Sequence, residues 1–201
     1  MNPQFWNERY RAEAYAYGRE PNDFLREVAT RIPKGRVLCL AEGEGRNAVY
    51  LASLGYEVTA LDFSEEGLRK ATALAQERGV TIRTVCANLA TYRFDPSSFA
   101  GVVAIWAHLP QPVRAEVHAG ASRALIPNGV FVLEAYTPRQ LAFDSGGPRD
   151  VSLLMTLEDL TRELEPLTLD IGREVERVID EGEFHRGPSA TVQVLARRAG
   201  V

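Results

Sequence analysis

The sequence predicts an α/β fold: one doubly wound sheet of seven strands with helices on both faces. From Arg36 onward, short apolar runs alternate with stretches in which apolar residues recur at helical spacing, the pattern typical of a mostly parallel sheet. Near the carboxyl terminus, two long extended stretches are separated only by "EGEFHRGP". No helix fits in that gap, so we expect these two strands to be antiparallel and to close the sheet as a hairpin.

The first part of the pattern gives three strands and two helices. The strands are expected at 36–41, 57–62 and 81–87, with helices at 46–54 and about 65–78. Ser64 fits an N-cap, and Glu65 and Glu66 then occupy the first turn, where the helix dipole favours anions. Gly79 ends this helix. The 3.6-residue spacing of its apolar positions predicts that one face packs on the sheet, through Leu68, Ala71 and Leu74.

The second part of the pattern adds four strands and two helices. We expect strands at 101–107, 130–136, 167–179 and 189–198, and helices at 112–125 and near 156–164. "PNG", Pro127 to Gly129, is typical of a turn and leads into the fifth strand. A loop rich in Gly and Pro, "DSGGPRD" from Asp144 to Asp150, follows that strand and has enough glycines to act as a gate, although a plain surface connection fits equally well.

The chain is expected to be one domain, residues 1–201, in which residues 1–35 stand apart from a core at 36–201. The amino-terminal segment is rich in aromatic side chains: Phe5, Trp6, Tyr10, Tyr15, Tyr17 and Phe24. We interpret it as a helical lid over the edge of the sheet where ligands bind. The alternative is a helix that only packs on the core.

The composition excludes several classes of protein. A net charge of −4 argues against a nucleic-acid binder, and no apolar run approaches the roughly 20 residues that span a bilayer. No leader opens the chain, so we expect a cytoplasmic protein without nucleic-acid or membrane partners, as a monomer or homodimer. Cys39 and Cys86 lie in apolar segments and are expected to be buried free thiols, and the scattered histidines supply no metal site.

The loop after the first strand, "AEGEGRNA" from Ala41, is the most informative motif. "GEGRNA" matches the glycine pattern of dinucleotide-binding loops, and Asp62 ends the next strand. Glu42 and Glu44 would however repel a pyrophosphate, which seeks backbone N–H groups at a helix start. The loop therefore favours a nucleoside without phosphates, such as S-adenosylmethionine, which carries a sulfonium. The alternative for the two glutamates is a solvated loop.

The sequence resembles the class I S-adenosylmethionine-dependent methyltransferases, and is similar to their tellurite-resistance group. The resemblance rests on "GEGRN" with "YLASLGYEVTALD", on "CANL", on "PNG" and on "FHRG…VLARR", in this order. It implies a Rossmann-like sheet with strand order 3-2-1-4-5-7-6 and an antiparallel strand 7. It also implies S-adenosylmethionine as cofactor and S-adenosylhomocysteine as product.

The resemblance also implies donor-binding positions. Asp62 should hold the ribose, with Phe63 against the adenine, while Asn88 and Leu89 define the base pocket. The full expected set is Ala41, Glu42, Gly43, Asn47, Asp62, Phe63, Asn88, Leu89 and Trp106. Arg46 and Asn47 fit equally well as the start of a helix.

This chain departs from the family pattern at three donor positions. Cys39 and Ala41 stand where the family has Asp and Gly, and Asn88 replaces an Asp. An Asn carbonyl can accept the adenine amino group as that Asp would. Glu42 is a candidate to compensate for the acid missing at position 39.

On the acceptor side, the candidate catalytic residues are His185, Arg186 and His108. His185 and Arg186 match a His-Arg pair that the tellurite-resistance group places near the reacting methyl, and the alternative is a solvated hairpin tip. His108 follows the fourth strand at the ligand edge and is a candidate base or pocket residue. The expected substrate contacts are Tyr10, Tyr17 and Tyr136.

The function implied is in-line methyl transfer from S-adenosylmethionine to a small-molecule acceptor: a thiol, a chalcogen oxyanion or a small metabolite. One alternative is a non-catalytic protein that binds S-adenosylmethionine or S-adenosylhomocysteine. Another is an NAD-dependent oxidoreductase, supported only by the glycine pattern at Gly43. Cofactor titration separates these classes.

Overall fold

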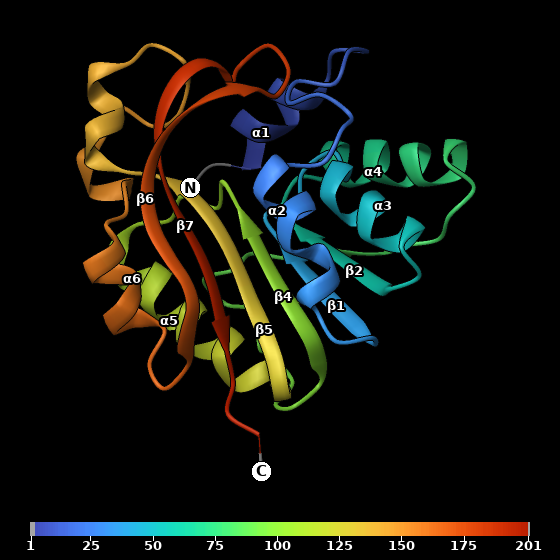
Figure 1. Ribbon diagram of the computed structural model, residues 1–201. Helices are drawn as coiled ribbons and strands as arrows, with labels where there is room; N and C mark the ends of the chain where they lie inside the picture. The colour runs from blue at the N-terminus through green and yellow to red at the C-terminus, as the bar shows by residue number, and fades with distance from the viewer. Residues whose placement is uncertain (1–2, 201) are drawn as a thin grey trace.

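The computed structural model describes residues 3–200 and contains one seven-stranded sheet (Figure 1). Its strand order is β3-β2-β1-β4-β5-β7-β6, as predicted. The strands are β1 Arg36–Leu40, β2 Glu57–Asp62, β3 Arg83–Cys86, β4 Phe99–Ile105, β5 Leu125–Tyr136, β6 Thr168–Asp180 and β7 Arg186–Arg197. β1 to β5 pair in parallel, whereas β7 is antiparallel to both β5 and β6. The predicted carboxyl-terminal hairpin is therefore confirmed.

Helices cover both faces of this sheet. They are α1 Pro3–Tyr10, α2 Asp23–Val28, α3 Arg46–Ser53, α4 Glu65–Glu77, α5 Gln111–Ala124 and α6 Leu157–Glu163, with short 3-10 turns at Ala29–Arg31, Pro138–Ala142 and Val151–Leu153. Apolar side chains of α5 and α6 form one core with the sheet, and those of α2 and α3 form another on the opposite face. The central strand β4 is buried along its whole length, which explains its continuous apolar run.

Local sequence signals fix where the helices begin. The Ser64 hydroxyl accepts a hydrogen bond from the Gly67 N–H at the start of α4, as predicted. Thr156 caps α6 in the same way, through the Asp159 N–H, and Asn22 caps α2. Each cap satisfies a backbone donor that the first turn of a helix leaves unpaired.

Three expectations need correction. β5 begins at Leu125 rather than at Val130, so Pro127 to Gly129 lie within it, where its pairing with β4 is irregular. β4 ends at Ile105 rather than at Ala107, because Trp106 adopts a left-handed backbone conformation with φ of 58° and turns the chain away. Cys86 is exposed rather than buried, since β3 is the edge strand of the sheet and has little cover; Cys39 is buried as expected.

The amino-terminal segment divides into two parts with different surroundings. α2 packs on the sheet through Phe24, Leu25 and Val28, which belong to the core. α1 instead lies at the end of the sheet where β4 ends, beside the turn between β6 and β7 (Figure 1). The segment that follows α1 is joined to this turn, because the Glu183 N–H donates to the Ala16 carbonyl at 3.1 Å. α2 therefore packs on the core as the alternative described, and the function of α1 as a lid stays a prediction.

No helix within residues 3–200 is long and apolar enough to cross a bilayer.

Candidate active site

A cavity of about 780 Å³ lies at the carboxyl ends of β1, β2 and β4. Its volume is within the range of small-molecule sites. Four parts of the chain form its wall: the α1 segment, the loops after the parallel strands, the Gly146–Pro148 loop and the β6–β7 turn. Ligands of open α/β sheets bind at this edge.

The loop between β1 and α3 follows an unusual backbone path. Ala41 and Gly43 have φ of 49° and 58°, in the left-handed region that favours glycine. Gly45, with φ of 88°, passes so close to α4 that an added Cβ would lie 2.5 Å from the Ala71 Cβ. Ala41 lines the cavity, so the residue that departs from the family pattern is part of the wall and carries some strain.

Glu42 forms part of the wall and also caps α3. Its Oε1 accepts hydrogen bonds from the N–H groups of Asn47 and Ala48, at 3.0 and 2.8 Å. Burial raises the pKa of this carboxyl to about 7, against the effect of these bonds. Asn47 is the second residue of α3 and lines the cavity; its side-chain oxygen accepts from the Asn22 N–H at 2.9 Å. A carboxylate therefore already uses the helix N–H groups that a pyrophosphate would need.

Glu44 is buried and paired rather than solvated. Its Oε1 lies 2.5 Å from the Lys70 Nζ of α4, and both side chains are at most 5% exposed. Its other oxygen accepts from the Tyr17 N–H at 3.4 Å. Glu44 thus joins the glycine loop to α4 and to the segment after α1, which is a structural task that the sequence did not reveal.

Asp62 lies at the end of β2 and faces the same cavity. Its two oxygens accept from the N–H groups of Gly43, at 2.9 Å, and Ser64, at 2.8 Å. Burial raises the pKa of the Asp62 carboxyl, although these bonds oppose the shift. Phe63, Asn88 and Leu89 line the wall next to it. The Asn88 oxygen accepts from the Ala90 N–H at 3.0 Å, so one of its two lone pairs stays available.

Aromatic side chains from distant segments also meet in the cavity wall. Trp6 stacks on Tyr10 with centroids 5.6 Å apart, and the Tyr17 ring lies 4.6 Å from the His185 ring. The His185 ring is also 5.2 Å from the Trp106 ring, edge to face. We call this part of the cavity, which is lined by Trp6, Tyr10, Tyr17, Trp106 and His185, the aromatic chamber.

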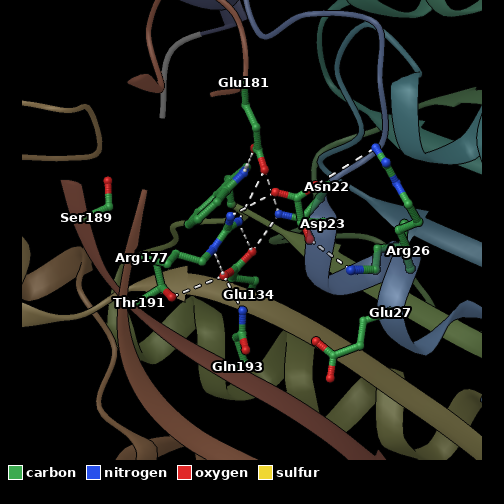
Figure 2. A network of polar contacts seen from close by, with 12 residues as sticks. Asn22, Asp23, Arg26, Glu27, Glu134, Arg177, Glu181, Ser189, Thr191 and Gln193 are labelled. Carbon is green, nitrogen blue, oxygen red and sulfur yellow. Dashed lines mark hydrogen bonds and ion pairs between the residues drawn. The ribbon is translucent and has the colours of Figure 1, made fainter. Parts of the chain in front are cut away.

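Glu181 connects this chamber to a buried polar network (Figure 2). Its Oε2 accepts from the Trp106 Nε1–H at 2.6 Å and pairs with Arg46 at 2.5 Å. Its Oε1 accepts from the Asn22 side chain at 2.9 Å. Burial opposes ionisation of Glu181, but Arg46 and these hydrogen bonds hold its pKa below the ordinary value.

The same network continues to Glu134 of β5, which is fully buried. Arg177 of β6 donates to both oxygens of this carboxylate, at 2.9 and 2.8 Å, and Asn22 donates at 2.6 Å (Figure 2). Thr191 and Gln193 of β7 donate as well, at 3.1 and 2.8 Å. Glu134 is therefore saturated with donors and lies outside the cavity wall, so it ties strands together and does not contact a ligand there.

His185 lies in the cavity wall and is only 7% exposed. Its Nδ1 has no hydrogen-bond partner among residues 3–200. Burial lowers the pKa of this imidazole to about 3, with further lowering by Arg46, while Glu181 opposes the shift. His185 is therefore a neutral imidazole with a polar atom left for a ligand.

His108 lines the cavity but both of its nitrogens are occupied. Its Nδ1 lies 2.9 Å from the Leu153 carbonyl, so that nitrogen carries the proton, and its Nε2 accepts from the Tyr136 N–H at 3.3 Å. Burial lowers its pKa to about 4. In this arrangement His108 has no free lone pair for an acceptor's proton, so a role as base, which stays a prediction, would require one of these two bonds to break.

Three further candidates lie outside the cavity wall. Arg186 points to solvent and pairs with Asp180 at 2.9 Å, because the alternation of β7 turns it away from its neighbour His185. Tyr136 is fully buried behind Trp106, with ring centroids 4.4 Å apart. Gly43 is covered by Tyr10, whose hydroxyl lies 2.6 Å from the position of an added Cβ. Tyr10 and Tyr17 do line the wall, as does Trp106.

Sequence reasoning missed several wall residues. Trp6 and Phe184 were visible as aromatics but had no assigned role, and Arg9 and Arg46 were not assigned to the ligand. Arg9 follows Trp6 by three residues and precedes Tyr10, so helical spacing could have placed all three near one face. No sequence signal joins Phe184 to them, because that contact spans most of the chain.

Part of the chain is similar to known methyltransferases. Residues 37–129 match a family model described as a methyltransferase domain. The uncharacterized methyltransferase YbaJ of Bacillus subtilis (strain 168) is 33% identical over 111 residues, which are 55% of this chain and 44% of that protein. The match thus spans less than half the length of that relative.

Solved structures share the fold at low identity. One, from work on the conversion of a disulfide bond into a thioacetal group during echinomycin biosynthesis, has a TM-score of 0.78 at 21% identity and covers 98% of this chain and 93% of its own. TehB from Haemophilus influenzae has a TM-score of 0.73 at 18% identity, covering 98% and 66%. An S-adenosylmethionine-dependent methyltransferase from Methanosarcina mazei has 0.68 at 19% identity, covering 87% and 98%. Residues 37–129 therefore match a methyltransferase domain, and the whole chain shares its fold with these solved structures.

Proposed function

We propose that the protein transfers a methyl group from S-adenosylmethionine to a small molecule held in the aromatic chamber. The observation that carries this proposal is one cavity whose wall combines two chemically different sets of groups. One set contains the carboxyl groups of Glu42 and Asp62 with Asn88, and the other contains Trp6, Tyr17, Trp106 and His185. Such a cavity suits a polar nucleoside donor beside an acceptor that must be shielded from water.

The carboxyl groups of the cavity wall fit S-adenosylmethionine better than they fit a dinucleotide. Asp62 is fixed by two backbone N–H groups and keeps lone pairs for ribose hydroxyls. Glu42 blocks the N-terminus of α3 for a pyrophosphate, and its ionised form, which prevails above its pKa of about 7, offers negative potential to a sulfonium or an ammonium. These contacts favour S-adenosylmethionine over NAD.

The protein's own part in the reaction is alignment and exclusion of water. Bound S-adenosylmethionine would supply an activated methyl group. Trp106, held by Glu181, and His185 form a rigid wall that positions an acceptor, and the α1 segment covers the opening. A thiolate or a reduced chalcogen anion needs no base. An acceptor that must lose a proton needs a base. Of the candidates His185, Arg186 and His108, His185 lies in the wall with a nitrogen that has no partner, and it is the residue proposed for this role.

Calorimetric titration with S-adenosylmethionine, S-adenosylhomocysteine and NAD tests the donor. We expect micromolar binding of the first two and none of the third. Asp62→Asn should weaken binding of S-adenosylhomocysteine roughly tenfold to a hundredfold, as for loss of hydrogen bonds to a charged group. Asp95→Asn, at an exposed position outside the wall, is the matched control. Absence of binding by the unaltered protein would defeat the proposal.

Turnover separates the methyltransferase from a protein that only binds the donor. The acceptor screen should contain small thiols and chalcogen anions, with formation of S-adenosylhomocysteine as the readout. Methyl transfer to any of them supports the enzyme; tight donor binding without turnover across the screen would favour the binding protein.

A further inference from the structure

Arg9 is a cationic side chain in the wall of the aromatic chamber. Its guanidinium carbon lies 3.9 Å from the centroid of the Phe184 ring and 5.2 Å from that of Phe5. Its Nη1 donates to the Tyr17 hydroxyl at 3.3 Å. The aromatic rings therefore hold the guanidinium plane in place through cation–π contacts, and only one of its five N–H donors is used within residues 3–200.

Arg9 has no carboxylate partner among the described residues. Arg46, the other arginine of the wall, pairs with Glu181 at 2.5 Å. Of the acidic side chains in the wall, Glu44 pairs with Lys70, and Glu42 and Asp62 accept hydrogen bonds from backbone N–H groups. Within residues 3–200, Arg9 is therefore a cationic side chain of the wall that has no carboxylate partner to balance its charge.

The unpartnered nitrogen of His185 belongs to the same part of the chamber. The Tyr17 side chain joins the two groups, since its hydroxyl accepts from Arg9 and its ring lies 4.6 Å from the His185 ring. Phe184, on which Arg9 stacks, directly precedes His185. A fixed cation and a buried imidazole that lacks a partner together form a binding site for an anionic group, because the guanidinium donates hydrogen bonds to oxygen and so does His185 in the tautomer that carries its proton on Nδ1. That tautomer has no free base at Nδ1, so anion binding and proton abstraction at this atom belong to different tautomers.

We propose that Arg9, with His185, binds an anionic group of the methyl acceptor, so that the preferred acceptors carry a carboxylate or a similar oxyanion. This inference rests on the proposed function and adds the charge of the substrate. The carboxylate of the donor's amino-acid tail is the other possible source of such an anion. Arg9 stacks on the β6–β7 turn and not on the loop after β1, which favours the acceptor.

Matched acids and amides test the preference. Protein saturated with S-adenosylhomocysteine is titrated with 3-mercaptopropionate and 3-mercaptopropionamide, and with phenylacetate and phenylacetamide. We expect at least one acid to bind tenfold or more tightly than its amide. Arg9→Gln should abolish this difference, whereas Arg9→Lys should keep part of it. Equal affinities within both pairs, or an acid preference that survives in Arg9→Gln, would overturn the proposal.

A second arm identifies the source of the anion. Affinities for S-adenosylhomocysteine and for 5′-methylthioadenosine, which lacks the amino-acid tail, are measured for the unaltered protein and for Arg9→Gln. We expect neither to change by more than twofold. A tenfold loss confined to S-adenosylhomocysteine would assign Arg9 to the donor carboxylate and refute its role in acceptor binding.

The control is Arg11→Gln, because Arg11 lies two residues away, is exposed and is not part of the wall. It removes the same charge from the same segment, and it should leave every affinity unchanged. The two failures are distinguishable: absence of S-adenosylhomocysteine binding defeats the proposed function, whereas normal binding without an acid preference defeats only the anion site.

Discussion

Trp106 donates its indole N–H to the Glu181 carboxylate at 2.6 Å, across the end of the sheet. Trp106 follows β4, and Glu181 follows β6 at the start of the hairpin turn. The same carboxylate pairs with Arg46, at the start of α3. One buried acid therefore holds three parts of the cavity wall together, and it stabilises the left-handed backbone of Trp106.

Replacing Glu181 by Gln should strongly destabilise the protein. A Gln can still accept from Trp106, but it leaves the Arg46 guanidinium buried without a counter-charge. Breaking a buried pair in this way costs about 3–5 kcal/mol. Urea unfolding at pH 7 measures the change. Asp180→Asn is the control, since that neighbouring acid is exposed; equal stabilities of the two variants would show that the buried pair contributes little.

Glu181→Gln should also change the surroundings of Trp106. The chain has two tryptophans, so a Trp6→Phe background leaves Trp106 as the only one. We expect a shift of its emission maximum in Glu181→Gln under conditions where the protein is folded, because the indole N–H loses a charged acceptor. An unchanged spectrum would mean that the neutral amide positions Trp106 equally well.

The Glu163 carboxylate should make stability fall in acid. Burial opposes its ionisation, but hydrogen bonds from His118 and Arg114 lower its pKa to about 2. A depressed carboxyl pKa contributes stability that is present above about pH 4.5 and is lost as the pH falls toward 2. We expect Glu163→Gln to be less stable at pH 7 and to show a flatter decline between pH 5 and 2, as measured by urea unfolding. Equal slopes would contradict this assignment.

Glu42 should have the opposite effect on the pH dependence. Burial raises its pKa to about 7, so the folded protein binds more protons than the unfolded chain between about pH 4.5 and 7. Stability should therefore fall as the pH rises through this window. Glu42→Gln keeps an acceptor for the N–H groups of Asn47 and Ala48 but cannot ionise. It should be more stable than the unaltered protein at pH 8, and of similar stability at pH 5; a difference that does not change with pH would be evidence against the raised pKa.

Gly146 should be essential for the packing of its loop on the acceptor end. It has φ of 124°, and an added Cβ would lie 2.2 Å from the Phe184 carbonyl oxygen and 2.8 Å from the His185 Cδ2. Gly146→Ala should therefore displace the loop or the β6–β7 turn. We expect binding of acceptor probes to fall tenfold or more, with little change in the affinity for S-adenosylhomocysteine.

Gly79→Ala is the control for Gly146→Ala. Gly79 also has a positive φ, of 67°, but an added Cβ there meets nothing within 4 Å. It introduces only the strain of the left-handed region, roughly 1–2 kcal/mol, without a collision. If both variants lose acceptor binding equally, strain and not loop packing is the cause.

The sequence alone predicted the elements whose signals are local. Apolar runs located the buried parallel strands, Ser64 marked the start of α4, and the short gap before β7 required an antiparallel hairpin. These features depend on neighbours within a few residues or on the reach of a short connection, so the residues themselves specify them. The same reasoning located the loop after β1 and Asp62 at one edge of the sheet.

The arrangement of the polar side chains depended on contacts that only the tertiary structure forms. The sequence does not show that Glu44 pairs with Lys70 or that both nitrogens of His108 have hydrogen-bond partners. Nor does it show that Arg186 points to solvent. Likewise, Arg9 and Phe184 lie far apart in the sequence, and their side chains are in contact only in the folded protein. The sequence by itself thus determined the fold and the edge where ligands bind. Long-range packing decided which charged side chains at that edge lack a partner. The reason is that burial and neighbouring groups set whether each side chain is ionised and whether it is free to contact a ligand.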